Sequence, residues 1–93
     1  MSAIRHVFKY YLKETDVQEV MMPTGAQILH VAQQAGMLCL WVLVELNNPL
    51  VERRIRIFGT GHPISVELGP FIGTVMMSSG LVWHIFDQGE APA

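Results

Sequence analysis

Charged side chains are scarce in this chain of 93 residues. They account for 15% of the sequence, where about 25% is usual in a globular domain. Six Lys and Arg residues and eight Asp and Glu residues give a formal net charge of −2. This balance argues against the basic surfaces with which proteins bind nucleic acids or anionic membranes. We therefore expect no nucleic-acid partner and no membrane partner.

Cysteine is almost absent, and long apolar runs are missing. The single cysteine, Cys39, lies inside an apolar stretch, so we interpret it as a small buried residue rather than a nucleophile. One cysteine excludes a disulfide framework and is typical of a reducing compartment. No apolar run approaches the roughly 18 residues of a membrane-spanning helix, and the N-terminus lacks the layout of a signal peptide. These features predict a soluble protein of the cytoplasm.

Hydrophobic residues, in contrast, are abundant, at 51% of the chain. The length allows one domain covering residues 1–93, because a second core could not be built from what remains. A small domain has proportionally much surface, so an apolar excess indicates a patch that a partner covers. The simplest partner is another copy of the chain. We therefore predict a homo-oligomer.

Alternation of apolar and polar residues predicts an all-β fold. The segment 27–34 tolerates a helical reading, but a tight turn at Ala35-Gly36 favours a strand there. About seven short strands separated by turns predict an antiparallel β-sandwich or a small barrel. A polar tail, residues 88–93, is predicted to be frayed. The other segments predicted as strands are residues 4–12, 17–22, 37–46, 51–58, 71–77 and 81–87.

The segment from Met37 to Leu46 is the most apolar part of the chain. Both of its faces are hydrophobic, whereas a strand with one face in water normally alternates. We expect it to be covered on both sides, by the core on one side and by a partner or a second sheet on the other.

The most polar candidate site lies between Arg53 and Pro63. Arg54 and Arg56 share one face of a predicted strand, and the guanidinium group binds phosphate in a fixed forked geometry. The turn that follows, Gly59-Thr60-Gly61-His62, offers backbone N–H groups of the kind that cradle anions. We predict a ligand-binding site for a small, nucleotide-like anion. In the competing interpretation, the arginines pair with Glu45 or Glu52, and His62 only stabilises its turn.

Catalytic and metal-binding patterns are weak. The four histidines have no spacing that favours a metal site, so we expect no metal and no cofactor. The serines lie outside any nucleophile-elbow pattern. An enzymatic alternative remains open, in which His62 or His84 acts as an acid or base beside a phosphate ester held by Arg54 and Arg56. We favour a non-enzymatic protein.

Five short stretches resemble a family of small uncharacterised proteins of tailed bacteriophages and prophages. The stretches are Pro23-Thr24-Gly25-Ala26 with Ile28-Leu29, Leu38-Cys39-Leu40-Trp41, Gly59-Thr60-Gly61-His62, Phe71-Ile72-Gly73-Thr74 and Leu81-Val82-Trp83-His84-Ile85-Phe86. The resemblance implies a phage accessory protein of the bacterial host cytoplasm. Such proteins bind host factors, including those of defence systems, or sequester nucleotide signals. A minor virion or assembly component is the other possibility that this context leaves open.

Overall fold

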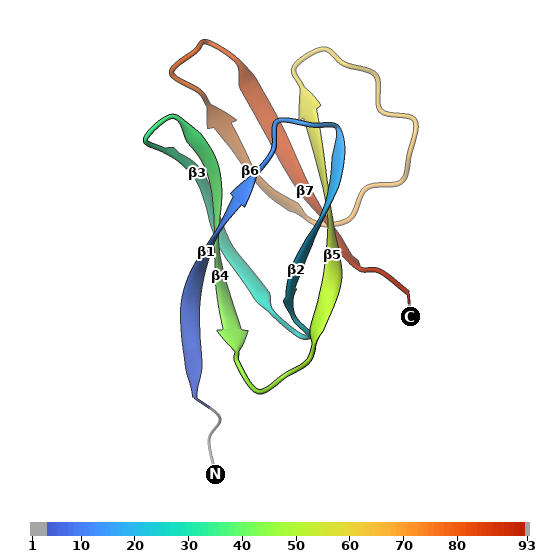
Figure 1. Cartoon of the computed structure of the whole chain (residues 1–93). Coiled ribbons are helices and arrows are strands. Elements are labelled where there is room, and N and C mark those ends of the chain that lie inside the picture. Colours follow the sequence, from blue (N-terminus) through green and yellow to red (C-terminus); the bar gives the residue numbers. More distant parts are fainter. Residues whose placement is uncertain (1–3, 93) are drawn as a thin grey trace.

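The structure, a computed structural model that describes residues 4–92, is an all-β sandwich. Two antiparallel sheets pack face to face without closing into a barrel (Figure 1). No helix among residues 4–92 is long and apolar enough to span a membrane. The seven strands are β1 (Arg5–Leu12), β2 (Val17–Pro23), β3 (Gln27–Gln34), β4 (Met37–Glu45), β5 (Leu50–Gly59), β6 (Phe71–Met76) and β7 (Val82–Glu90).

The strand order is β1-β4-β3 in one sheet and β2-β5-β7-β6 in the other. The edge strands β3 and β6 lie against each other, so that side of the sandwich is closed. The prediction that residues 27–34 form a strand is confirmed. Ala35 and Gly36 both have positive φ, 51° and 77°, which is the geometry of the two-residue turn that joins a tight hairpin.

The core lies between the two sheets and is built from inward-facing aliphatic side chains. On β4, Leu38, Leu40, Val42 and Val44 are at most 2% exposed. They pack with other buried residues of the core, including Ile55 and Ile57 of β5 and Ile85 of β7. Alternation along each strand produces this core, because every second side chain of a strand points to the same face.

The outer face of β4 does not follow the expectation of cover on both sides. Cys39 is fully buried, but Trp41 and Leu43 are only half-buried and Met37 is exposed. Within residues 4–92 no second sheet lies over this face. The flanking side chains of β1 and β3 provide the cover that Cys39 has, because Tyr11 and Ala32 are its neighbours across the sheet.

The predicted frayed tail is wrong for residues 88–90, because β7 continues to Glu90. The polar composition of this segment suggested a free end, but distant partners hold it. The Gly25 N–H donates to Glu90 Oε2 at 2.7 Å, and the Ala91 N–H donates to the carbonyl oxygen of Glu52 at 2.8 Å. Ala93 lies outside the described residues.

Candidate functional site

The three arginines of β5, Arg53, Arg54 and Arg56, lie on two different faces of the strand. Arg53 shares the inward face with Ile55 and Ile57. Arg54 and Arg56 share the outward face, as predicted from the alternation of β5. The three side chains therefore meet different surroundings.

Arg54 is paired with an acidic residue of the neighbouring strand. Its Nη2 atom lies 3.2 Å from Glu19 Oε1, in the register that sets Glu19 of β2 opposite Arg54. Neither acidic residue named from the sequence is the partner. Glu52 belongs to β5 itself, and Glu45 ends β4 in the other sheet. Both side chains of the pair are well exposed, so the pair itself contributes little to stability.

Arg56 has no such partner among residues 4–92. Its side chain forms no hydrogen bond or ion pair there, and the side-chain Nε atom is buried without an acceptor. Arg56 lines a surface hollow of about 310 Å³ beneath the loop that follows β5. We call this the Arg56 hollow. Its lining residues are Asp16, Arg56, Phe58, His62, Pro63, Ser65 and Val66.

The turn after β5 places His62 at this hollow. The His62 N–H donates to the Gly59 carbonyl oxygen at 3.1 Å, and Gly61 adopts a φ of 86° that glycine tolerates easily. The imidazole of His62 packs on Gly59, where an added Cβ would lie 2.9 Å from His62 Cε1. The turn therefore uses the N–H of His62, one of the groups of the predicted anion cradle, within itself. The His62 side chain lines the Arg56 hollow.

Thr60 points to a different histidine. Its Oγ1 atom lies 2.8 Å from His84 Nε2, and Thr74 Oγ1 lies 2.9 Å from His84 Nδ1. Both ring nitrogens of His84 are thus bonded to hydroxyl groups, one as donor and one as acceptor in the neutral ring. The structure divides the predicted site in two, with Arg56 and His62 at the Arg56 hollow and the Thr60 side chain bonded to His84.

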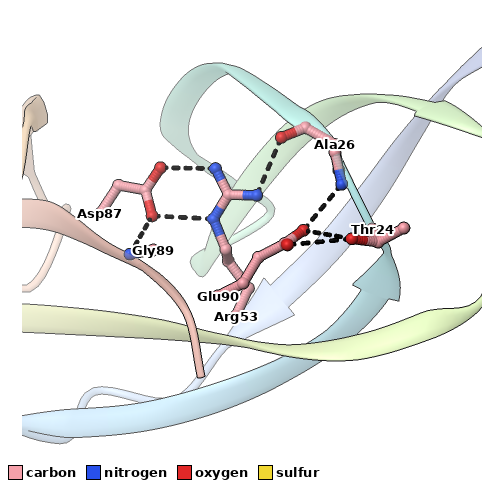
Figure 2. A network of polar contacts seen from close by, with 7 residues as sticks. Thr24, Ala26, Arg53, Asp87, Gly89 and Glu90 are labelled. Atoms are coloured by element: carbon pink, nitrogen blue, oxygen red, sulfur yellow. Dashed lines mark hydrogen bonds and ion pairs between the residues drawn. The ribbon is translucent and has the colours of Figure 1, made fainter. Parts of the chain in front are cut away.

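The sequence interpretation missed the most connected polar group of the structure, which Figure 2 shows. Arg53 forms a two-point pair with Asp87, with Nε to Oδ1 at 2.9 Å and Nη2 to Oδ2 at 2.7 Å. Its Nη1 atom donates to the Ala26 carbonyl oxygen at 2.9 Å. The Arg53 and Asp87 side chains are only 12% and 15% exposed. The alternation of the sequence could have indicated this pair, because Arg53 and Asp87 lie two residues from Ile55 and Ile85 and therefore share their inward faces.

The pKa values of this group follow from its contacts. Burial alone raises the pKa of the Asp87 carboxyl, but the hydrogen bonds from Arg53 and the Gly89 N–H, with the charge of Arg53, lower it below its usual range. The hydrogen bond to Asp87 raises the pKa of Arg53, with the charge of Asp87 acting in the same direction. Hydrogen bonds from the Gly25 N–H and Thr24 lower the pKa of Glu90. Arg53 and Asp87 neutralise each other's charge, and Arg53 also holds the Ala26 carbonyl oxygen, so the group has a structural role. We call the Arg53–Asp87 pair with its bond to Ala26 the clamp.

No metal centre is formed in the part of the chain that the structure describes. No group of three or more His, Cys, Asp and Glu side chains is placed to hold an ion between residues 4 and 92. His30 lies beside Trp41, with ring centres 6.0 Å apart, and His6 lies beside Phe8 at 5.9 Å. These two histidines are therefore in contact with aromatic rings on the sheet β1-β4-β3.

Comparison with known proteins gives a family and no activity. No curated protein and no solved structure matches the chain. A family model described as a domain of unknown function, DUF7352, matches residues 3–93. Because the match covers nearly all of the sequence, the chain belongs to the DUF7352 family.

Proposed function

We propose that this protein is a non-catalytic binding protein that holds a small, nucleotide-like anion in the Arg56 hollow. The observation that supports this most directly is the state of Arg56. Of the three arginines on β5, Arg53 and Arg54 are neutralised by Asp87 and Glu19, whereas Arg56 has no acidic partner among the described residues. A guanidinium group without a counter-ion beside a hollow is suited to an anion that enters from solution.

The other lining residues fit a phosphorylated ligand with an organic part. The side chains of His62 and Ser65 can donate hydrogen bonds to phosphate oxygens. Phe58 and Pro63 provide apolar surface against which a base can pack. The Asp16 carboxylate repels a second phosphate but accepts hydrogen bonds from hydroxyl groups. At about 310 Å³ the hollow is at the small end of ligand sites, which favours a mononucleotide over a larger molecule.

We place this activity in the context that the sequence resemblance implies. The stretches shared with small proteins of tailed phages and prophages support a phage accessory protein that acts in the bacterial host cytoplasm. A nucleotide-binding protein there would withdraw a signal from the host, for instance from a defence system, or would bind a host factor in its ligand-bound state.

Calorimetric titration tests the proposal with a panel of mononucleotides, cyclic nucleotides and inorganic phosphate. We expect binding of at least one phosphorylated ligand and a loss of about 10-fold to 100-fold in affinity in Arg56→Gln, because a hydrogen bond to a charged group is removed. Arg54→Gln is the matched control, since it makes the same change on the same face but at an arginine that Glu19 already neutralises. Equal affinities of wild type and Arg56→Gln, or no binding at millimolar ligand, would refute the proposal.

One observation favours the enzymatic alternative. Thr60 Oγ1 lies 2.8 Å from His84 Nε2, which is the spacing of a hydroxyl nucleophile and its base. A hydroxyl group, Thr74 Oγ1, rather than a carboxylate bonds the opposite ring nitrogen, so nothing there stabilises a charged imidazole. Turnover of a nucleotide or phosphodiester that His84→Ala abolishes would establish an enzyme. Absence of turnover across a broad substrate panel would leave the binding function.

A further inference from the structure

We propose that β1 is an interface through which two copies of the chain pair edge to edge. The two β1 strands would run antiparallel about a two-fold axis and join two three-stranded sheets into one continuous sheet of six strands. This goes beyond anion binding, because it uses the side of the molecule formed by β1. It also gives the self-association expected from the apolar composition a definite location.

The edges of the two sheets are not equivalent. The strands β3 and β6 lie against each other, and the pairing of each with its neighbour is interrupted by a register shift. The edge strand β2 ends at Pro23, which lacks an N–H, and the Gln18 side chain bonds the Lys13 backbone at its other end. The strand β1 pairs with β4 over all eight of its residues without a shift, as β2 does with β5 over seven, but β1 contains no proline. A long regular edge of this kind is a template for another strand.

Of the two basic residues on β1, Arg5 and Lys9, the one in the middle of the strand has its charge turned away from the open edge. Lysine on an edge strand discourages pairing with other chains. Here Lys9 Nζ donates to Gln34 Oε1 at 2.8 Å, although Gln34 belongs to β3 on the far side of β4. The amino group is therefore drawn across the sheet, away from the open side of β1. β1 contains no acidic residue whose charge could protect the edge in place of Lys9.

Apolar side chains are uncovered along the same edge. Val7 and Tyr11 on the outer face are 56% and 58% exposed. Phe8 points to the face that forms the core, yet it is 37% exposed, because β4 is the only strand against which β1 packs closely. Figure 1 shows β1 along the outer side of its sheet. A second copy placed at this edge would cover Phe8 from the open side.

Charge and the number of paired residues together favour one register for the pair. In an antiparallel two-fold pair, one residue faces its own copy, and every opposed pair lies on the same face of the sheet. With the axis at Val7, Arg5 would face Lys9 of the second copy, and with the axis at Lys9, that lysine would face itself. With the axis at Phe8, the pairs are Phe8 with Phe8, His6 with Tyr10, Arg5 with Tyr11 and Val7 with Lys9. This register avoids directly opposed like charges and sets aromatic rings against each other.

Sedimentation velocity of the full chain from low to high micromolar concentration tests the interface. We expect a dimer in the wild type and a dissociation constant raised about 100-fold or more in Phe8→Asp, because the two-fold axis brings two carboxylates together. The control is Met21→Asp, which makes the same change at an exposed apolar residue of the other regular edge, β2. Circular dichroism establishes that each variant is folded.

A second variant tests the register and does not depend on the stability of Phe8→Asp. Opposed residues of antiparallel strands have Cα atoms about 4.5 to 5.5 Å apart, within the range that a disulfide spans. Phe8→Cys should therefore form a covalent dimer on mild oxidation, whereas Met21→Cys should not. The native Cys39 is buried and does not compete for the oxidant.

The following results of the sedimentation and cross-linking experiments would overturn the proposal. A monomer at every concentration would remove the self-association, and a dimer that persists in Phe8→Asp without cross-linking in Phe8→Cys would place the interface elsewhere. Open-ended assemblies dispersed by Met21→Asp would indicate pairing of β1 with β2. Failure here is separable from failure of anion binding, because Phe8→Asp should keep the nucleotide affinity of the wild type and Arg56→Gln should keep its dimer.

Discussion

The arginines of β5 show how position decides what one residue type does in this protein. Arg53 points between the sheets, where Asp87 satisfies it in a two-point pair. Arg54 points to solvent and shares its charge with Glu19 across the strand pair. Arg56, two residues further on the same face, has no acidic partner among the described residues and lines the Arg56 hollow. The guanidinium that can bind a ligand is the one that the fold does not already use.

Gly69 is a residue at which a single added carbon should be costly. A Cβ at this position would overlap the backbone carbonyl oxygen of Asp87, which cannot move without distorting β7. We expect Gly69→Ala to lower the free energy of unfolding by about 1 to 3 kcal/mol, measured by chemical denaturation. Glu67→Ala, an exposed change in the same loop, should stay within about 0.5 kcal/mol of wild type. An unchanged midpoint in Gly69→Ala would mean that the loop does not pack on β7 in solution.

At the scale of strands, alternation predicted the elements well and their ends less well. All seven strands lie where the sequence predicted them. Alternation indicated most of them, because it reports which face of a strand is buried, whereas the turn at Ala35-Gly36 indicated β3 and the apolar run from Met37 to Leu46 indicated β4. The end of β7 was not predictable in this way. Gln88 to Glu90 are polar, and they are ordered by bonds to residues more than 15 positions away, such as the Gly69 N–H to Gln88 Oε1. The alternation of residues along one strand cannot indicate hydrogen-bond partners that are distant in sequence.

The candidate site was predictable to a similar extent. The shared face of Arg54 and Arg56 follows from alternation alone, and the structure confirms it. The partner of Arg54 depends on which strand lies beside β5, and Glu19 is 35 residues away in sequence. The inward pair of Arg53 and Asp87 could have been suggested by alternation, but opposite charges at two core-facing positions become a pair only when β5 and β7 are known to be neighbours.

The end of β7 should be needed for stability although it was expected to be frayed. We predict that a chain ending at Asp87 melts at least about 5 °C below wild type. It loses Glu90, which accepts hydrogen bonds from the Thr24 hydroxyl and the Gly25 N–H, and Ala91, whose N–H donates to Glu52. Differential scanning calorimetry measures the shift. A chain ending at Ala91 is the control and should melt close to wild type, whereas equal melting of the shorter chain would show that the tail contributes nothing.

For the molecule as a whole, polar bonds link the two sheets at the end of the sandwich where β3 begins. Arg53 of β5 donates to the carbonyl oxygen of Ala26, directly before β3 of the other sheet. Glu90 of β7 binds the turn between β2 and β3. On the side where β1 and β2 form the edges, the Gln18 side chain of β2 bonds the backbone of Lys13, directly after β1 of the other sheet. The chain therefore links its two sheets on both sides, and what stays open to a partner is the edge of β1 that faces away from β4.

The same clamp should make the protein sensitive to acid. Its carboxyl, Asp87, has a folded-state pKa below its ordinary value of 3.8, so the folded protein binds this proton less readily than the unfolded chain. The clamp therefore stabilises the fold above that ordinary value and is lost as the pH falls through the folded-state pKa. We expect the free energy of unfolding to be nearly constant from about pH 7 to pH 5 and to fall below that range.

Asp87→Asn separates this group from the other carboxylates. The variant cannot hold a negative charge beside Arg53, so at pH 7 it should be less stable than wild type by about 2 kcal/mol, the size of a hydrogen bond between charged groups. Because the variant has no proton to take up at this position, its stability should depend less steeply on pH below pH 5 than that of wild type. Urea denaturation at a series of pH values measures both curves. Parallel curves would assign the acid sensitivity to other groups and would mean that Arg53 does not hold Asp87 ionised in the folded protein.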